Sequence, residues 1–401
     1  RWLLYYEDWI AKLRATFAGE PWIRRVEWRH YIVIPEGSRA VEKEPVPWQG
    51  DAFDFVFIDG FSGPWKNAND DYSDTSFGIA IERLRIARSN WQANGKSPSV
   101  RCVFVERRGA AFNKLQAAAT AVTDMKCTPL RGQLEDQIAQ IREVAGNKAF
   151  TLTFVDPTGW SFDLQRLAPL LQRKPGEVLV NFMYEHFRRF IDHQRPDIRA
   201  SQDPAFGGPS WRDRYTALLS QGLGKEEAVL ETFKHQLRTV CGFDFVASAR
   251  IRHPLKSQTH FFLVYGTRHL KGLVKFRDAE KEALRSEEAY RCQAQGHSLQ
   301  DRTGQGSLFT DRDVFTGNTF ADPRKDDHVA LEQWLRRTVQ LQAYEYEKLA
   351  KAALERFSVT EPEFKDILVN LHQSGFLAFE GMKQRQGKPS SGVKIARRIA
   401  A

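Results

Sequence analysis

Apolar runs alternate with helical segments through the middle of the chain. Strand-like runs rich in β-branched and aromatic residues occupy positions 53–58, 100–105, 149–155 and 178–182. Segments with helical periodicity lie between them at 78–89, 110–122 and 164–171. Strands that are apolar throughout, separated by helices, are typical of a mainly parallel sheet covered on both faces. We therefore predict a Rossmann-like α/β domain over residues 50–291, with a helical insertion near 187–240.

The segments that flank this domain have different patterns. Residues 1–49 predict an N-terminal helical extension, and a strand pair within 243–265 precedes a helix over 272–291. Residues 292–325 carry Gly, Ser, Asp and Gln without periodicity, which predicts a linker.

The C-terminal segment, 326–401, predicts a separate domain. Its pattern favours one helix over 327–356, a shorter helix over 360–374 and a strand at 376–379, followed by a polar turn and a basic strand. Helices followed by a basic hairpin are typical of a winged-helix domain.

Charge and composition limit the choice of partners and location. The net charge is +9 and the pI about 9.3, which favours polyanions without distinguishing nucleic acid from a membrane surface. No apolar run reaches the roughly 18 residues needed to cross a bilayer. We see no secretory leader, so we expect a cytoplasmic protein without a membrane anchor.

The cysteines do not have the spacing of a metal site. Cys102, Cys127, Cys241 and Cys292 are far apart, and there is no CxxC or HxxxH pair. We expect reduced, structural thiols and no metal bound by this chain alone.

A glycine-containing turn follows the first strand-like run. Asp59, Gly60, Phe61 and Gly63 come where an α/β sheet binds ligands, beyond the carboxyl ends of its strands. The glycines would let the backbone approach a nucleoside closely, and Asp59 would contact the ligand directly or through water. A turn with a purely structural role is the alternative.

An acidic residue, Glu106, ends the next strand-like run. A carboxylate there can accept hydrogen bonds from both hydroxyls of a ribose. The alternative is a solvated strand end without a ligand.

An Asp-Pro pair follows the run 149–155. Asp156 and Pro157 would present a carboxylate and a carbonyl group that accept hydrogen bonds from an amine, and Trp160 could stack on a base. The alternative is a turn that starts a helix, with Trp160 in the core.

Basic residues suggest two phosphate-binding regions. Arg188 and Arg189 follow the run 178–182. The C-terminal segment contributes Lys383, Arg385, Lys388, Lys394 and Arg397. Phosphate contacts of this kind provide affinity without reading sequence, and a solvated helix face or a protein contact is the alternative.

Together these motifs resemble a known family. Residues 58–64 (IDGFSGP), 105–106 (VE), 154–160 (FVDPTGW) and 265–272 (YGTRHLKG) are similar to those of the three-Cys-motif partner protein (TcmP) family. The resemblance covers roughly residues 50–290, and the C-terminal winged region also fits it.

The resemblance implies a class I methyltransferase-type sheet that binds S-adenosylmethionine, and a partner that bears a three-cysteine motif and is similar to radical S-adenosylmethionine proteins. The implied cofactor-binding residues are Asp59, Gly60, Phe61, Gly63, Glu106 and Gln133. Two features depart from methyltransferase motifs: a third glycine is missing near Trp65, and the amino-methyltransferase pattern Asp-Pro-Pro-aromatic becomes Asp156-Pro-Thr-Gly-Trp160.

The leading hypothesis is an S-adenosylmethionine-dependent methyltransferase, or a methyltransferase-like protein, that acts on nucleic acid with this partner. The first alternative is a non-catalytic scaffold that binds the partner and nucleic acid. The second is a metal-dependent nuclease that uses Asp59, Glu106 and Asp156.

Overall fold

The computed structural model describes residues 52–63, 72, 75–157, 159–256, 258–303, 322–339, 342–383 and 386–398. The predicted N-terminal extension and Arg385 lie outside these residues, as does most of the predicted linker. The chain forms two compact units. One runs to Val246 and includes Thr259–Arg268, and the other contains Ala247–Gln258 and the chain from His269 onward.

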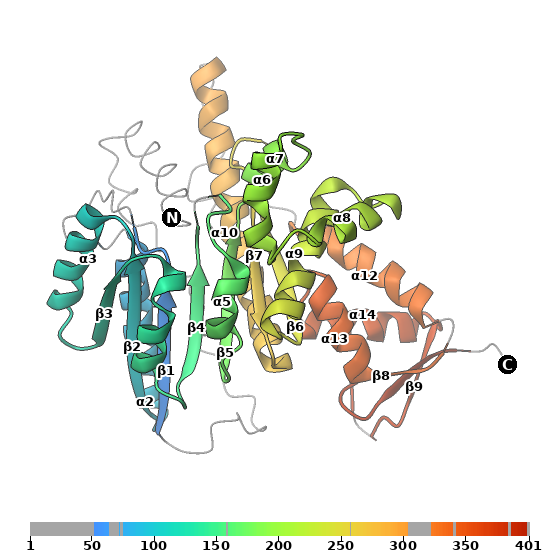
Figure 1. The fold of residues 1–401 in the computed structure, drawn as a ribbon. Helices are drawn as coiled ribbons and strands as arrows, with labels where there is room; N and C mark the ends of the chain where they lie inside the picture. The colour runs from blue at the N-terminus through green and yellow to red at the C-terminus, as the bar shows by residue number, and fades with distance from the viewer. Residues whose placement is uncertain are drawn as a thin grey trace. The chain divides into compact units, whose positions relative to one another are not determined.

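The main sheet of the chain has seven strands, and all of them except most of β6 belong to the first unit (Figure 1). Its strands in chain order are β1 (Ala52–Asp59), β2 (Ser97–Glu106), β3 (Lys126–Arg131), β4 (Phe150–Val155), β5 (Gly176–Phe182), β6 (Phe245–Arg252) and β7 (Thr259–Thr267). Their order across the sheet is β3-β2-β1-β4-β5-β7-β6. Strands β1 to β5 pair in parallel, and β7 runs antiparallel to β5. The prediction of a mainly parallel α/β fold is therefore confirmed.

Strand β3 was not among the predicted strands. Its sequence, KCTPLR, is half-polar and contains Pro129, which cannot donate a ladder hydrogen bond. Proline is tolerated here because β3 is the edge strand of the sheet.

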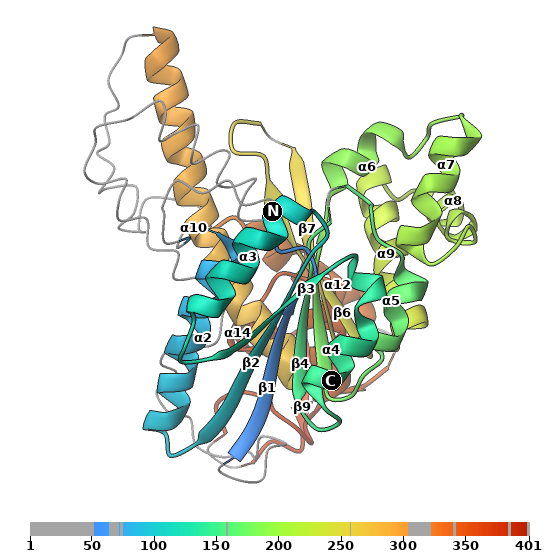
Figure 2. The ribbon, with the colours of Figure 1, turned by 60° about the vertical axis from the view of Figure 1, so that its left-hand side comes forward.

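Helices cover both faces of the sheet (Figure 2). Helices α2 (Ser76–Ala93) and α3 (Gly109–Ala121) cover one face, and α4 (Ile138–Ala145) and α5 (Leu164–Leu171) cover the other. Successive side chains of a strand point to opposite faces. In β1, Phe55 and Phe57 accordingly pack with α2 and α3, whereas Val56 and Ile58 pack on the opposite side.

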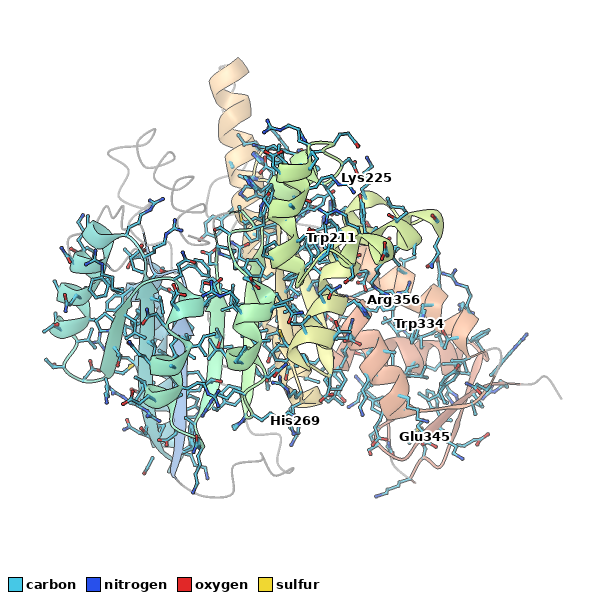
Figure 3. All side chains as sticks on the ribbon, viewed as in Figure 1. Trp211, Lys225, His269, Trp334, Glu345 and Arg356 are labelled. Atoms are coloured by element: carbon cyan, nitrogen blue, oxygen red, sulfur yellow. The ribbon has the colours of Figure 1, made fainter. Side chains whose placement is uncertain are left out.

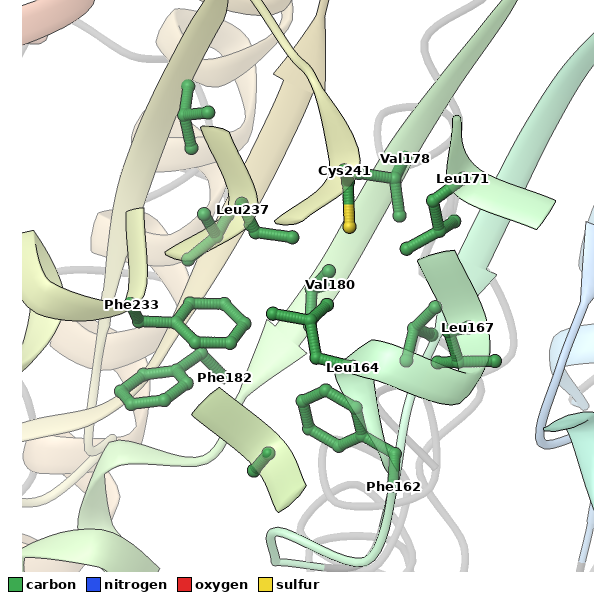
Figure 4. Packing of buried hydrophobic residues seen from close by; sticks show 14 of the residues in the cluster. Phe162, Leu164, Leu167, Leu171, Val178, Val180, Phe182, Phe233, Leu237 and Cys241 are labelled. Carbon is green, nitrogen blue, oxygen red and sulfur yellow. The ribbon is translucent and has the colours of Figure 1, made fainter. Parts of the chain in front are cut away.

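Four helices between β5 and β6 form the insertion: α6 (Tyr184–Phe190), α7 (Pro196–Gln202), α8 (Trp211–Ser220) and α9 (Lys225–Cys241). Its core is aromatic, because Trp211 is 1% exposed and stacks on Phe206 with ring centroids 4.2 Å apart (Figure 3). Helix α9 packs Phe233 and Leu237 towards α5 and β5 (Figure 4). Helices α6 and α7 lie beyond the end of the sheet to which β4 points (Figure 1).

The second unit combines helices with a small sheet. Its elements are α10 (Leu270–Thr303), α12 (Lys325–Thr338), β8 (Tyr344–Glu345), α13 (Tyr346–Arg356), α14 (Glu361–Gln373), β9 (Leu377–Glu380) and β10 (Lys394–Arg397). The sheet order is β8-β10-β9, with both pairs antiparallel.

Two predictions for this unit were wrong. The single helix expected over 327–356 is divided into α12 and α13, because Tyr344 and Glu345 pair with the distant strand β10. Helix α10 continues to Thr303, into the segment expected to be a linker from 292. That stretch has one glycine and no proline, and a glycine costs a helix only about 1 kcal/mol.

Candidate cofactor and substrate site

Four buried polar side chains lie in a row at the carboxyl ends of four neighbouring strands. Asp59 and Glu106 end β1 and β2, Asp156 directly follows β4, and Asn181 lies near the end of β5. Their exposed fractions are between 1% and 6%. Phe57, Phe104 and Phe154, two residues before the three acids, pack on the side of α2 and α3, while Val180 and Phe182 flank Asn181 on the opposite side. Strand alternation therefore directs all four polar side chains to the same face of the sheet.

Asp59 is held by its own turn. Its Oδ1 accepts a hydrogen bond from the backbone N–H of Phe61 at 2.9 Å, and Ser62 Oγ donates to the backbone carbonyl of Asp59 at 3.1 Å. Burial raises the pKa of Asp59 from 3.8 to about 6, and the nearby charge of Asp156 contributes in the same direction. The site therefore contains a carboxyl group that changes charge just below neutral pH.

Gly60 is required by packing. A Cβ atom at this position would lie 2.4 Å from Cδ2 of Leu134, in the short 3-10 helix Leu134–Asp136. The backbone N–H of Gly60 donates to Phe154 O at 3.0 Å, and that of Ser62 donates to Val105 O at 2.9 Å. The turn 59–63 is thus joined to β4 and β2.

Glu106 connects β2 to the start of α3. Its Oε1 accepts a hydrogen bond from the backbone N–H of Arg108 at 2.6 Å, at the N-cap position of the helix. No described residue donates a hydrogen bond to Oε2. Gln133 follows β3 but is exposed, so it does not belong to the buried row.

Asp156 and Asn181 form a pair across β4 and β5. Asn181 Nδ2 donates to Asp156 Oδ1 at 2.7 Å. The other amide atom, Asn181 Oδ1, is buried and has no hydrogen-bond partner among the described residues. A buried acceptor without a donor is costly, so this oxygen is well placed to accept a hydrogen bond from a ligand. Pro157 is buried beside the pair.

Trp160 packs against α6. Its ring centroid lies 4.6 Å from that of His186 and 5.2 Å from that of Phe187, and the Trp160 side chain is only partly buried. Gly159 has a φ of +67°, and a Cβ there would lie 2.7 Å from the His186 ring. Packing against the core therefore covers one side of the Trp160 ring, and another part of the ring remains accessible to solvent.

The pair formed by Glu185 and His260 was not predicted from the sequence. Glu185 Oε2 lies 2.5 Å from His260 Nδ1, and Glu185 Oε1 accepts a hydrogen bond from Arg189 at 2.8 Å. Burial alone would raise the pKa of Glu185, but the hydrogen bonds from His260 and Arg189 outweigh it and lower that pKa. The antiparallel pairing of β7 with β5 brings His260 near this position, and no local pattern signals such a long-range contact.

The predicted phosphate-binding residues are on the surface. Arg188 and Arg189 are exposed on α6, and Lys383, Lys388, Lys394 and Arg397 are exposed on β10 or on the turn before it. Lys388 forms an ion pair with Asp366. These two groups belong to different units of the chain.

Only one group in the described part of the chain brings three possible metal-binding side chains together: Asp322, His328 and Glu363. Arg324 already donates to Glu363 at 2.8 and 2.9 Å and to Asp322 at 2.8 Å. The three carboxylates invoked for a nuclease, Asp59, Glu106 and Asp156, form no such group.

In the strand order, the antiparallel strand β7 lies between β5 and β6. No protein-family model matches the chain, and no curated protein matches it. Within the described residues, no helix is long and apolar enough to span a membrane.

The solved structures that match the chain have low sequence identities and low TM-scores. A Legionella pneumophila protein described by the family model DUF519 is 10% identical with a TM-score of 0.33, over 59% of this chain and 84% of that one. The cyclopropane synthase MmaA2 of Mycobacterium tuberculosis is 13% identical with a TM-score of 0.23, over 63% and 70% of the two chains. A loganic acid methyltransferase with SAH is 9% identical with a TM-score of 0.26, over 63% and 74%.

Proposed function

We propose that the chain is an S-adenosylmethionine-dependent methyltransferase that acts on an amine of a nucleic acid. The observation that carries the proposal is the row of Glu106, Asp59, Asp156 and Asn181 on one face at the carboxyl edge of the sheet. Ligands of open α/β sheets bind beyond this edge. The row divides into a half suited to the cofactor and a half suited to the substrate.

The cofactor half consists of the ends of β1 and β2. Glu106 Oε2 has no donor among the described residues and would accept a hydrogen bond from a ribose hydroxyl. Asp59 would interact with the methionine end, with Phe61 and Gly63 forming the wall beside it. S-adenosylmethionine would supply an electrophilic methyl group at this place.

The substrate half consists of Asp156, Pro157 and Asn181. Asp156 and the free acceptor Asn181 Oδ1 would accept the hydrogen bonds of an exocyclic amine and fix the direction of its lone pair. Alignment of this kind contributes much of the acceleration of a direct transfer. Asp156 and Asn181 would hold the amine while its nitrogen takes the methyl group from the sulfur of the cofactor, and the surplus proton of the amine would pass to water.

The order of elements in the second unit supports the proposal that it is a winged-helix module. Helix α12, strand β8, helices α13 and α14 and the hairpin β9–β10 follow one another, with β10 central in the sheet. Lys383, Lys394 and Arg397 on this hairpin are exposed and suit contacts with phosphates. We propose that this module holds the nucleic acid, and that a three-Cys-motif protein acts with the chain.

The scaffold alternative is favoured by the departures from the amino-methyltransferase motif. The second proline is absent, and Trp160 packs on His186 and Phe187. A scaffold would bind nucleic acid and the partner without transferring a methyl group to any nucleic acid.

The decisive experiment is calorimetric titration with S-adenosylmethionine and S-adenosylhomocysteine. Glu106→Gln retains an acceptor for the Arg108 N–H and removes the charge, so the variant should fold normally. We expect it to bind both ligands about 10- to 100-fold more weakly, the effect of losing a charged hydrogen bond. Glu143→Gln, at an exposed position of α4, is the matched control. Absence of binding by the folded wild-type chain would refute the methyltransferase and leave the scaffold.

A further inference from the structure

A continuous set of aromatic rings extends from the Asp-Pro turn along α6. Ring centroids lie 4.6 Å apart between Trp160 and His186, 5.6 Å between His186 and Phe190, and 6.3 Å between Phe190 and His193. Trp160 also contacts Phe190 directly at 5.6 Å. We name these four residues, Trp160, His186, Phe190 and His193, the aromatic ridge.

The ridge is partly exposed along its whole length. All four side chains have intermediate exposure, whereas Phe187, beneath Trp160, is 0% exposed. Phe187 therefore anchors the ridge to the core while the other rings reach the surface. His186 and Phe190 lie on α6, Trp160 lies in the turn after β4, and His193 follows the end of α6.

The charges beside the ridge suit a polyanion. Arg189 is 60% exposed and lies close enough to His186 to lower its pKa, together with the larger effect of burial. The His186 ring is therefore neutral at physiological pH and presents a π face. Arg189 is the more exposed partner of its ion pair with Glu185, and Glu185 also contacts His260, so Arg189 can exchange this pair for a phosphate while Glu185 keeps its other partner. Arg188 is exposed and pairs with no described residue.

We propose that the aromatic ridge binds single-stranded nucleic acid, with unpaired bases stacking on Trp160, His186, Phe190 and His193 and with Arg188 and Arg189 contacting the phosphates. Proteins that bind single strands combine aromatic side chains with a positively charged path for the backbone. The ridge begins at Trp160, four residues after Asp156, so a strand lying on it would deliver a neighbouring base to Asp156 and Asn181. The delivery of a base to Asp156 and Asn181 rests on the proposed function, whereas the binding of single strands to the aromatic ridge does not.

This geometry selects single strands over duplexes. In a duplex the base faces are covered by their neighbours, and only edges and phosphates are accessible to a protein. RNA and single-stranded DNA offer the same stacking faces and differ at the 2′-hydroxyl. Single-stranded RNA and single-stranded DNA both fit the aromatic ridge, and binding measurements on each distinguish them.

The test is fluorescence anisotropy with the full chain and labelled strands of about 12 nucleotides, a length within the range of single-strand sites. Four probes are compared: single-stranded RNA, single-stranded DNA, a DNA strand of the same length without bases, and the duplex. We expect at least one single strand to bind about 10-fold or more tightly than the strand without bases, because stacking contributes strongly to each base bound. Equal affinity for the strand without bases, or a preference for the duplex, would overturn the proposal.

Two variants assign this affinity to the ridge. Phe190→Leu keeps an apolar side chain but removes a stacking face, and His193→Ala changes a residue beyond the end of α6. We expect each to weaken base-dependent binding about 5-fold or more. Trp91→Leu, a partly exposed aromatic position at the opposite end of the sheet, is the matched control and should bind like the wild type. Unchanged binding by both ridge variants would overturn the proposal even if Phe190→Leu lowers thermal stability.

Titration with S-adenosylmethionine on the same samples separates the two proposals. Base-dependent binding without cofactor binding would support the ridge and reject the methyltransferase. Cofactor binding with no discrimination between the single strands and the strand without bases would reject the ridge and retain the methyltransferase.

Discussion

The amide nitrogen of Asn181 donates a hydrogen bond of 2.7 Å to Oδ1 of Asp156, and both side chains are 1% exposed. The contact joins two neighbouring parallel strands at the edge where ligands of this fold bind. It fixes the orientation of the Asn181 amide and therefore leaves its oxygen as an acceptor without a donor. A buried pair with one unused acceptor is better suited to positioning a ligand than to stabilising the fold.

Substitution of either residue should separate methyl transfer from cofactor binding. We expect Asp156→Ala to abolish transfer and Asn181→Leu to lower it about 100-fold, the scale of a small misplacement of reacting groups. Cofactor affinity should be retained in both, because Glu106 and Asp59 lie on other strands. The measurement is incorporation of labelled methyl groups into nucleic acid pools, with calorimetric titration in parallel. Loss of cofactor affinity in either variant would contradict this division of roles.

The stability of the protein should depend on the ionisation of Asp59. Its pKa is about 6 in the folded chain, against 3.8 for an unperturbed carboxyl group, because burial disfavours the charged form. The folded state therefore holds this proton more tightly than the unfolded state. The contribution of protonated Asp59 to the free energy of unfolding is therefore fully present below pH 3.8 and is lost as the pH rises through 6. The free energy of unfolding at high pH should be lower than at low pH by about 3 kcal/mol on this account.

Asp59→Asn tests this pH dependence. The amide oxygen still accepts the Phe61 N–H but cannot ionise. We expect the variant to be more stable than the wild type at pH 8, by up to about 3 kcal/mol, and equally stable near pH 4. The free energy of unfolding from urea titrations at several pH values measures the difference. A difference independent of pH would show that Asp59 is not responsible. Asp59→Asn should also bind the cofactor more weakly, because substitutions that stabilise a functional site commonly reduce its function.

The sequence sufficed to place three of the four polar residues of the site. Asp59, Glu106 and Asp156 each follow an apolar run, and in a parallel sheet such ends meet at one edge. Asn181 was not singled out as a site residue from the sequence, because its unpaired oxygen depends on the side-chain contact with Asp156.

Other features depend on contacts between distant segments. Gly60 was predicted for a close approach to a ligand, yet the close neighbour is Leu134, and Gly159 is restricted in a similar way by His186. The pairing of Tyr344 with β10 interrupts the single helix that the periodicity of residues 327–356 predicted. Packing and strand pairing of this kind override local preferences.

Arg268, within the motif at 265–272, has a structural role that the sequence does not reveal. Its guanidinium donates hydrogen bonds to the carbonyl oxygens of Leu171, at 2.9 Å, and Cys241, at 2.7 Å, where α5 and α9 end. It also donates to the carbonyls of Arg173, Gly176 and Gly242. A cation at helix C-termini satisfies carbonyls that lack partners within the helix.

Arg268→Met should therefore destabilise the first unit markedly. Charged hydrogen bonds contribute about 1.5–3 kcal/mol each when one partner is lost, and they do not add fully, so we expect a loss of about 2–4 kcal/mol. Arg85→Met is the contrasting control, because the ion pair of Arg85 with Asp124 is exposed and should contribute less than about 1 kcal/mol. Urea unfolding of Arg268→Met and Arg85→Met measures the loss in the free energy of unfolding for each variant. Similar losses would show that Arg268 does not act through the helix ends.

Cysteine reactivity provides a test of the packing between β2 and β3. Cys102 and Cys127 are register partners on these strands. The Cys102 thiol donates its hydrogen bond to Met125 Sδ at 3.3 Å, and its proximity lowers the pKa of the partly exposed Cys127. Burial raises the pKa of Cys241 to about 12. Because the thiolate is the reactive form, iodoacetamide at pH 8 should alkylate Cys127 first and Cys241 only on unfolding. Peptide mass spectrometry over time gives the order. Cys102→Ala removes the neighbouring thiol and should slow alkylation of Cys127. Faster labelling of Cys127 in this variant would show that exposure, and not the neighbouring thiol, controls its reactivity.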